Sequence, residues 1–533
     1  MRLAGLARCA RTFSKPSRNS HQFLVQDRLV SRRYISGDNG ASKSIAKLLE
    51  WKPQVEARDV MVNGFIRSVR TMKARSFVAL GDGSSLAPLQ ALVPTNQAEG
   101  LTVGAAVRLT GSWVPSPGTG QSHELHVDNA QVLGPSDPKT FPIQKKYQTP
   151  EYLRTMPHLR PRTPFNSALL RFRSEVIASL TQFFATRDFV QTHPPIITSS
   201  DCEGAGEVFT VSPTTKKQDE TDESFFRAQK YLTVSTQLHL EALAQSVGNV
   251  WTLSPTFRAE RSDTSRHLSE FYMLEAEMSF VDELSGIMDL IEDMLRFMST
   301  SLYTSRVAQE LRRPNDKSSG GSAGDRASPE EVEQRWQGLM QSSWPRLSYT
   351  EAVNLLKAEE HLFEHKPVWG EGLQSEHEKH IARVIGQGKP VFVTDYPREI
   401  KAFYMRPTAA RGQATTDELT SVQQTVECFD ILVPEFCEIA GGSMREHRLA
   451  QLLDAMKRHG IVAPTLEGRG HPDMDEFTSL AGSLDWYADL RRWGCPPHGG
   501  FGLGFDRLIG YLSGVQTIRD TVTFPRWYGR CDC

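Results

Sequence analysis

Two separated segments of this 533-residue chain carry residue types that could bind a flat ring and phosphate groups. Residues 496–507 form a glycine-rich run, expected to be a strand, which leads into an apolar helix with Arg507 at the junction. Glycines such as Gly504 leave the backbone bare, so that a planar ring can lie against it. A guanidinium held at such a junction donates to phosphate oxygens. Taken alone, this run is equally compatible with a strand that ends in a tight turn.

The second segment, residues 256–271, lies far upstream and offers cations for phosphates together with a ring for stacking. Its polar and aromatic candidates are Arg258, Glu260, Arg266, His267 and Phe271. A cation over one face of an aromatic base and a ring against the other face form a sandwich. An arginine or a phenylalanine on a strand is, taken singly, a surface or core residue. The combination of both segments therefore carries the prediction of a site.

Two acidic residues, Asp430 and Glu438, lie in a third strand-like segment. Carboxylate oxygens are hard ligands and suit Mg²⁺ that bridges the phosphates of a nucleotide. The plain alternative is a charged strand end. The segment is therefore a candidate metal site.

Together these segments resemble motifs 2 and 3 of the class II aminoacyl-tRNA synthetases, and in detail the asparaginyl branch of the aspartyl, asparaginyl and lysyl subgroup. The resemblance implies that ATP is a substrate and that Arg258 and Arg507 are the catalytic residues. Arg258 would bind the α-phosphate and the reacting carboxylate, and Arg507 would cover the adenine and reach the γ-phosphate. Asp430 and Glu438 would hold Mg²⁺. The other ATP contacts would come from Glu260, Arg266, His267, Phe271, Glu438 and Gly504.

The same resemblance places the amino-acid substrate. Gln237 and Glu203 would bind its α-amino group, and Arg445 would meet its side-chain oxygen. Relatives specific for aspartate carry a lysine where this chain has Leu240, and Glu241 follows. We expect the Glu241 carboxylate to accept a hydrogen bond from an asparagine amide and to repel aspartate. The alternative for Glu241 is an exposed position on its helix.

The chain departs from the family pattern at residues 435–437. Relatives have small residues and glycine where Glu435, Phe436 and Cys437 stand. The departure lies just before Glu438, so it affects the expected backbone and the metal geometry there.

Residues 55–135 contain short strands with hairpin signals, which fit a small barrel of the OB type. By resemblance this barrel reads an anticodon. Phe77 would stack on the middle anticodon base, Gln90 would hydrogen-bond to it, and Arg67 and Arg70 would hold phosphates. The alternative for Phe77 is packing in the core of the barrel.

Residues 136–165 are interpreted as a linker, and residues 166–533 as an α+β catalytic domain on an antiparallel sheet flanked by helices. Pro195 matches the proline of motif 1, which in this family lies at a two-fold interface, so the resemblance predicts a homodimer. Four polar stretches are expected to be inserted loops, at residues 213–223, 312–328, 407–419 and 460–479.

The composition of the chain bears on its partners and its cellular location. The net charge of −2 gives no global sign of nucleic acid, and no apolar run is long enough to span a bilayer. The seven cysteines have no zinc-like spacing and are expected to be reduced thiols. Residues 1–36 are rich in arginine and serine and contain one acid, which is typical of a mitochondrial transit peptide. A basic arm that touches RNA is the alternative.

The resemblance therefore predicts an enzyme of the mitochondrial matrix that joins L-asparagine to tRNA(Asn), with ATP, Mg²⁺ and a second copy of the chain as partners and no membrane. Three alternatives stay open at this stage. They are the same chemistry with aspartate, a non-catalytic RNA-binding paralogue, and an ATP-dependent asparagine synthetase on the same fold. Leu240 and Glu241 argue against the first, the retained site residues against the second, and the barrel against the third.

Overall fold

The computed structural model describes residues 42–118, 120–144, 146–199, 207–213, 225–226, 228–313, 326–408, 424–461 and 484–533. The predicted transit peptide and Glu203 lie outside these ranges, and so does most of each predicted insertion. Residues Lys43–Cys533 form one unit.

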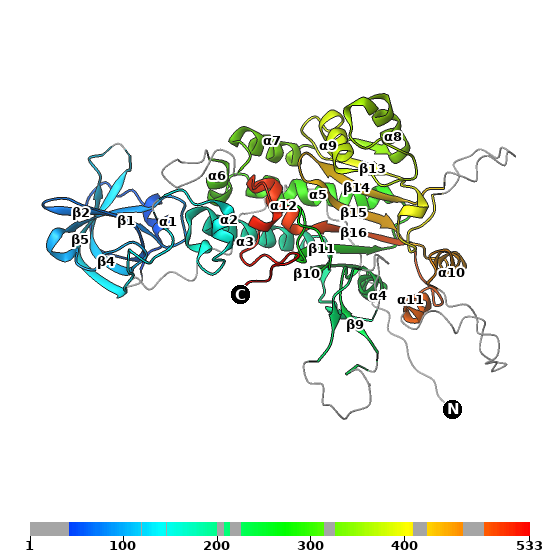
Figure 1. The fold of residues 1–533 in the computed structure, drawn as a ribbon, viewed down its shortest axis with the longest axis horizontal. Helices are drawn as coiled ribbons and strands as arrows, with labels where there is room; N and C mark the ends of the chain where they lie inside the picture. Colours follow the sequence, from blue (N-terminus) through cyan, green and yellow to red (C-terminus); the bar gives the residue numbers. More distant parts are fainter. Residues whose placement is uncertain are drawn as a thin grey trace, which may run out of the picture. The chain divides into compact units, whose positions relative to one another are not determined.

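The N-terminal part of this unit is a closed barrel with the strand order β1, β2, β3, β5, β4 (Figure 1). Side chains alternate along each strand, and the inward ones, such as Val78 and Leu80 of β2, are fully buried. Helix α1 (Ile45–Glu50) adds Ile45 and Leu48 to the same core. The strands are β1 (Ala57–Thr71), β2 (Arg75–Gly81), β3 (Leu89–Pro94), β4 (Ala106–Pro115) and β5 (His123–Gly134).

The C-terminal part is built on an eight-stranded sheet with the order β12, β13, β14, β15, β16, β11, β10, β6. Figure 1 shows β14, β15, β16, β11 and β10 side by side, although they come from distant stretches of sequence. All pairs from β13 to β10 are antiparallel, and both edge pairs are parallel. The strands are β6 (Val190–Gln191), β10 (Asn249–Phe257), β11 (Glu270–Ser279), β12 (Arg346–Ser348), β13 (Val391–Thr394), β14 (Cys428–Val433), β15 (Cys437–Met444) and β16 (His498–Gly504).

One face of this sheet is buried under helices. Alternate residues of its central strands, such as Leu274 and Ala276 of β11 and Leu503 of β16, join the large apolar core. The helices on this core are α3 (Pro164–Ala185), α5 (Leu284–Leu302), α6 (Arg306–Arg312), α7 (Pro329–Met340) and α12 (Phe505–Ser513). The remaining residues of the central strands point to the opposite face, which carries the site.

The other elements surround this framework. A small sheet has the order β7 (Ile197–Thr198), β9 (Lys230–Leu232), β8 (Thr210–Val211). The remaining helices are α2 (Pro150–Arg154), α4 (Gln237–Val247), α8 (Tyr349–Ala358), α9 (Ser375–Val384), α10 (Leu449–Arg458) and α11 (Asp485–Asp489). The predicted fold class is confirmed: an OB-like barrel precedes an α+β domain on a largely antiparallel sheet. None of the described helices combines the length and the apolar character that crossing a membrane requires.

Candidate active site

The floor of the site is a row of paired positions in the middle of the large sheet. Asp430 of β14 pairs with Gly441 of β15, and Gly441 pairs with Gly502 of β16. Gly502 in turn pairs with Glu275 of β11. Two neighbouring strands thus present bare backbone, with a carboxylate on each side. The space above the two glycines is where a ligand can approach the sheet.

At other positions of the same glycine-rich run, glycine is required for different reasons. A Cβ atom added to Gly500 would lie 2.1 Å from the backbone oxygen of Ala276 and 2.1 Å from Oε2 of Glu277. At Gly504 the nearest atom to an added Cβ is Cδ of Arg507, at 3.5 Å. Gly500 is therefore required by packing, whereas Gly504 has room above it for a ligand.

A hollow of about 640 Å³, partly open to solvent, lies over one end of this floor. We name it the Phe271 hollow. Every residue that the sequence predicted to contact ATP lines it: Arg258, Glu260, Arg266, His267, Phe271, Glu438, Gly504 and Arg507. The structure thus brings together two segments that the sequence separates widely.

Three arginines, Arg258, Arg266 and Arg507, line the Phe271 hollow together with three acidic residues. The Arg258 guanidinium lies 5.7 Å from the centroid of the Phe271 ring and 3.8 Å from Oε1 of Glu260. Nε2 of His267 lies 3.2 Å from Oε2 of Glu260. Burial lowers the pKa of His267; Glu260 opposes this shift, and Arg507 reinforces it. The neutral imidazole is therefore favoured, and the arginines supply the positive charge that phosphates need.

A second hollow of about 1080 Å³ adjoins the first, and we name it the Arg445 hollow. Gln237, Leu240 and Arg445 line it. The resemblance predicted this position for Gln237 and Arg445. The two hollows share Arg258 and Glu438, together with Met273 and Gly502. A carboxylate bound in the second hollow and a phosphate bound in the first can therefore meet at Arg258.

Gln237 is oriented by its neighbour one helical turn away. Its Nε2 donates to Oε1 of Glu241 over 3.1 Å. The carboxylate only accepts, so the amide NH₂ group must face it, and the Gln237 carbonyl oxygen faces the hollow. That oxygen is the acceptor that an α-ammonium group requires.

Arg445 is fixed at the bottom of its hollow. Its Nε donates to Oε1 of Glu277 over 3.1 Å, and its Nη2 donates to Oε2 of the same residue over 2.9 Å. Nη1 donates to Oγ of Ser443 over 2.6 Å. A guanidinium has five N–H groups, and these bonds use three of them. The other two are available for the oxygen of a substrate side chain.

Glu241 does not lie where the sequence interpretation placed it. Its side chain is fully buried and does not line either hollow. The carboxylate accepts from Arg491, Tyr487 and His498, in addition to Gln237. The expected direct contact with a substrate amide is therefore not supported by this geometry. The alternative of an exposed helix position is wrong, because the helix turns this residue into the protein.

Two acids that the sequence interpretation missed do line the Arg445 hollow, namely Glu275 and Glu277. Glu275 accepts from Oγ of Ser235 over 2.5 Å and from the backbone N–H of Thr236 over 3.0 Å. A signal for both residues was present, since they follow Phe271 at even spacing on one strand and must share its face. Lys401, which also lines the hollow, carries no such local signal.

The two predicted metal ligands lie on adjacent strands. A Cβ atom added to Gly441 would lie 3.1 Å from Oδ1 of Asp430 and 3.2 Å from Oε1 of Glu438, so both carboxylates flank one point of the floor. Asp430 also accepts from Nζ of Lys401 over 2.8 Å. Burial raises the pKa of Glu378 of α9 to about 7, and the neighbouring Glu438 and Asp430 add to the rise. This excess of negative charge and the oxygen ligands fit Mg²⁺.

The departure at residues 435–437 does not interrupt strand β15. Glu435 and Cys437 adopt φ angles of +66° and +60°, in the left-handed region that glycine prefers. Cys437 is 2% exposed and lies 3.0 Å from Nη1 of Arg266. The backbone therefore keeps a glycine-like path although neither position holds glycine. The described cysteines are free, as expected.

In the barrel, Phe77 and Gln90 lie on the same outer face. Phe77 pairs with Leu92 and Ala79 pairs with Gln90, so both predicted residues share one parity. Phe77 is half-buried and lies outside the core of the barrel. Arg70 is exposed and pairs directly with Phe77.

Arg67 points elsewhere. Its guanidinium donates to the backbone oxygens of Leu86 over 2.7 Å and of Ser85 over 3.0 Å. Arg70 is therefore better placed than Arg67 to contact a phosphate beside Phe77.

Pro195 is exposed, and exposed apolar side chains lie near it in sequence and on helix α3. A contiguous patch of exposed apolar side chains normally marks a protein–protein interface. They are Leu170, Ile177, Val190, Ile196 and Ile197.

Comparison with known proteins agrees with the geometry of the two hollows. Residues 149–528 match the family of class II tRNA synthetases (D, K and N). The chain is 38% identical to the mitochondrial asparagine–tRNA ligase of Saccharomyces cerevisiae over 503 residues, covering 91% of this chain and 96% of that protein. It is 39% identical to the asparaginyl-tRNA synthetase of Mus musculus, covering 89% and 91%.

A solved structure is also similar. The asparaginyl-tRNA synthetase of Pyrococcus horikoshii, complexed with asparaginyl-adenylate, superposes with a TM-score of 0.72 at 26% identity, covering 92% of this chain and 99% of that one. The chain therefore belongs to the class II aminoacyl-tRNA synthetases, in the group that serves aspartate, lysine and asparagine.

Proposed function

We propose that this protein, an asparagine–tRNA ligase, forms asparaginyl-adenylate in the Arg445 and Phe271 hollows and transfers the asparaginyl group to tRNA(Asn). The observation that carries the proposal is the shared wall at Arg258 and Glu438. Because one guanidinium borders both hollows, it can hold the carboxylate and the α-phosphate in line.

In the first step a carboxylate oxygen of asparagine attacks the α-phosphorus of ATP, and the bond to pyrophosphate breaks. Arg258 and Arg507 neutralise the charge that develops on the phosphate oxygens. No side chain needs to act as a nucleophile. Mg²⁺, held by Asp430 and Glu438, would supply further positive charge at the phosphates. In the second step a ribose hydroxyl at the tRNA 3′ end attacks the acyl carbon, and AMP leaves.

Recognition of asparagine follows from the lining of the Arg445 hollow. Gln237 offers a carbonyl oxygen to the α-ammonium group, and Arg445 offers two N–H groups to the side-chain amide oxygen. Glu275 is placed to accept from the amide NH₂ group. Leu240 lines the hollow where aspartate-specific relatives carry a lysine, so no added cation pairs with a second carboxylate oxygen. The predicted contact of Glu203 stays a proposal, since that residue lies outside the described chain.

The outer face of the barrel is the proposed anticodon reader. Phe77 offers a ring for stacking, Gln90 offers an amide for a base edge, and Arg70 offers a cation for the backbone. We expect Phe77→Ala to raise the KM for tRNA about five- to 150-fold, from the loss of about 1–3 kcal/mol of stacking. Pyrophosphate exchange, which needs no tRNA, stays at the level of the unmodified protein.

The proposed assembly is a homodimer through the region of Pro195 and the exposed apolar residues of helix α3. The proposed location is the mitochondrial matrix, supported by the composition of residues 1–36 and by the mitochondrial relatives. Sedimentation and import into isolated mitochondria test these two statements separately.

The central test is pyrophosphate exchange with asparagine and with aspartate in parallel, on the full chain and on the chain lacking residues 1–36. We expect exchange with asparagine and at least a hundredfold less with aspartate. Comparable exchange with aspartate contradicts the assignment of the Arg445 hollow and leaves the synthetase chemistry intact. Exchange with neither amino acid, in folded protein, favours a non-catalytic RNA-binding role.

A further inference from the structure

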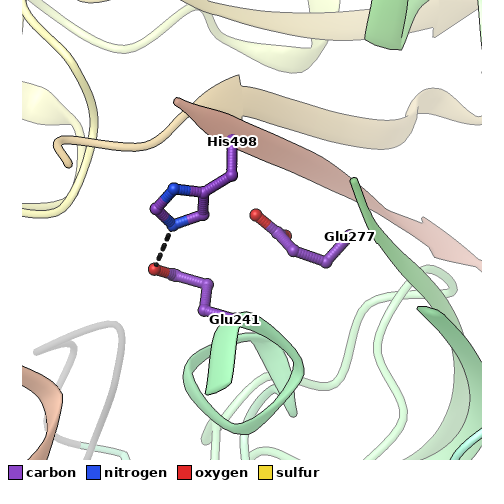
Figure 2. Close-up of side chains that lie close together, drawn as sticks. All are labelled: Glu241, Glu277 and His498. Atoms are coloured by element: carbon purple, nitrogen blue, oxygen red, sulfur yellow. Dashed lines mark hydrogen bonds and ion pairs between the residues drawn. The ribbon is translucent and has the colours of Figure 1, made fainter. Parts of the chain in front are cut away.

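A cluster that resembles a metal-ligand set extends from Glu277, in the wall of the Arg445 hollow, to residues behind that wall. Glu241 of α4, Glu277 of β11 and His498 of β16 converge in Figure 2, and one ligand atom of each lies within 4.8 Å of the others. All three side chains are buried. A buried group of two carboxylates and an imidazole requires compensation by a cation.

Two arginines already provide this compensation. Nη2 of Arg491 donates to Oε2 of Glu241 over 2.6 Å, and both side chains are fully buried. Arg445 donates twice to Glu277. The carboxylate oxygens that would bind a metal ion are therefore already bonded to guanidinium groups. The cluster is a network of ion pairs and not a metal site.

The hydrogen bonds of His498 fix its charge. Its Nε2 lies 3.0 Å from Oε2 of Glu241, and its Nδ1 lies 2.8 Å from the backbone oxygen of Pro496. Both partners only accept, and a neutral imidazole has one N–H donor, so both bonds form only with the imidazolium. Arginines only donate, so Glu241 and Glu277 accept as carboxylates from Arg491 and Arg445, and Arg445 opposes the rise that burial imposes on the pKa of Glu277. Burial also raises the pKa of Glu275, and hydrogen bonds from Ser235 and Thr236 oppose that rise.

The charges around Arg445 are therefore balanced, and the other charged residues that line the hollow, Arg258 and Lys401 against Asp430 and Glu438, also balance. The anions are Glu241, Glu275 and Glu277, and the cations are Arg445, Arg491 and His498. Glu241, Arg491 and His498 do not line the hollow. We propose that this buried layer of Glu241, Arg491 and His498 selects asparagine over aspartate, by making the wall of the Arg445 hollow electrically neutral.

The physical reason is the cost of an unpaired buried charge. An asparagine side chain is neutral and enters a balanced wall without adding charge. An aspartate side chain brings a fourth anion to three cations, and a like charge at a desolvated site is strongly disfavoured. The inference rests on the proposed position of the substrate side chain at Arg445. It means that residues without contact to the substrate contribute to the selection of asparagine over aspartate.

The test alters the balance by one charge at a time and measures kcat/KM for both amino acids by pyrophosphate exchange on the full chain. Glu241→Gln leaves one excess cation, so we expect the aspartate-to-asparagine ratio to rise at least tenfold at pH 6.0. The rise should be smaller at pH 8.0. His498 has then lost the Glu241 charge and faces Glu277, Arg445, Arg491 and Cys495, and it gives up its proton more readily.

The double variant separates charge balance from structural damage. Glu241→Gln with His498→Gln removes one charge of each sign, and we expect the ratio to return to within about threefold of the unmodified protein although two members are gone. Arg492→Gln, the exposed neighbour of Arg491, is the matched control and leaves the ratio unchanged. Thermal unfolding of each variant reports any loss of folded protein.

Two results overturn the inference. One is an unchanged ratio for Glu241→Gln at pH 6.0. The other is a double variant whose selectivity for asparagine is no better than that of the single variant. That result is expected if the layer is purely structural, because each substitution would then reduce the selectivity further. Failure of the proposed function looks different, because the unmodified protein then shows no asparagine exchange at all.

Discussion

The Phe271 hollow and the Arg445 hollow lie on the same sheet, but their polar groups are held in different ways. In the first, Arg258 follows the end of β10, Arg266 lies in a loop and Arg507 lies in the first turn of α12, and all three side chains are half-buried. In the second, the charged groups around Arg445 are buried and paired with other protein groups before a ligand arrives. Phosphates bring their own charge, so an open set of cations suffices for binding. A neutral amide must be distinguished from an acid of the same shape, and this requires a wall whose charge is fixed beforehand.

His267, which lines the Phe271 hollow, and His498, which lies behind the Arg445 hollow, differ in the direction of their pKa shifts. Burial lowers the pKa of His267 in the Phe271 hollow. In the layer behind the Arg445 hollow, burial also lowers the pKa of His498, but hydrogen bonds to Cys495 and Glu241 outweigh it and raise the pKa to about 10. The neutral form of His267 is therefore favoured, whereas His498 is a cation of the framework.

The largest effect is expected where the hollows meet. Arg258→Ala removes the group that both hollows share, so we expect kcat for pyrophosphate exchange to fall about 10³-fold, as for loss of a donor that acts on developing charge. Arg261→Ala, an exposed neighbour, is the control. A loss confined to the KM of one substrate would show that the two ligands do not meet at Arg258.

Two glycines of β16 separate a requirement of packing from a requirement for ligand space. In Gly500→Ala the new Cβ would meet the Ala276 backbone and the Glu277 carboxylate at 2.1 Å, so we expect a loss of about 3 kcal/mol in the free energy of unfolding. In Gly504→Ala the nearest atom is at 3.5 Å, so the fold is retained and the KM for ATP rises about tenfold. Denaturant unfolding and exchange kinetics measure both, and equal unfolding losses would remove the distinction.

A cation added to the Arg445 hollow should leave the Phe271 hollow untouched. For Leu240→Lys we expect kcat/KM for asparagine to fall about tenfold, because a desolvated ammonium is placed beside Arg445. The KM for ATP should change less than twofold. Val247→Lys, at an exposed position of the same helix, is the control. An equal loss toward ATP would mean that the hollows are not independent.

The smallest effect concerns pH. Because the pKa of His498 is raised from 6.5 to about 10, its stabilising contribution is complete below pH 6.5 and is lost as the pH rises toward 10. We expect the Tm of the unmodified protein to fall by a few degrees more between pH 7 and pH 10 than that of His498→Gln. Identical Tm profiles would show that His498 is not the cation that its hydrogen bonds require.

Much of the Phe271 hollow could be predicted from the chain itself. Its residues occur in two short segments whose local spacing is enough to place an arginine, a ring and bare backbone. Each predicted ATP contact lines the hollow, and Leu240 lines its neighbour. The barrel was equally accessible, because strand alternation alone places Phe77 and Gln90 on one face.

The Arg445 hollow could not be predicted in the same way. Glu241 was expected to face the substrate, and the direction of helix α4 decided otherwise. Its partners Tyr487, Arg491 and His498 lie about half the chain away in sequence. No short sequence pattern marks such a network, because only the packing of α4 against the segments around α11 and β16 brings the opposite charges together in a dry interior.

The sequence by itself thus determined the fold class, the residues that line the Phe271 hollow and the chemistry of the family, because these depend on residue types at short spacing along one strand or turn. The tertiary structure decided which carboxylates face the substrate and which lie behind it. That choice depends on the relative orientation of distant elements, and in a low-dielectric interior the orientation determines which charges are paired and which remain for a ligand.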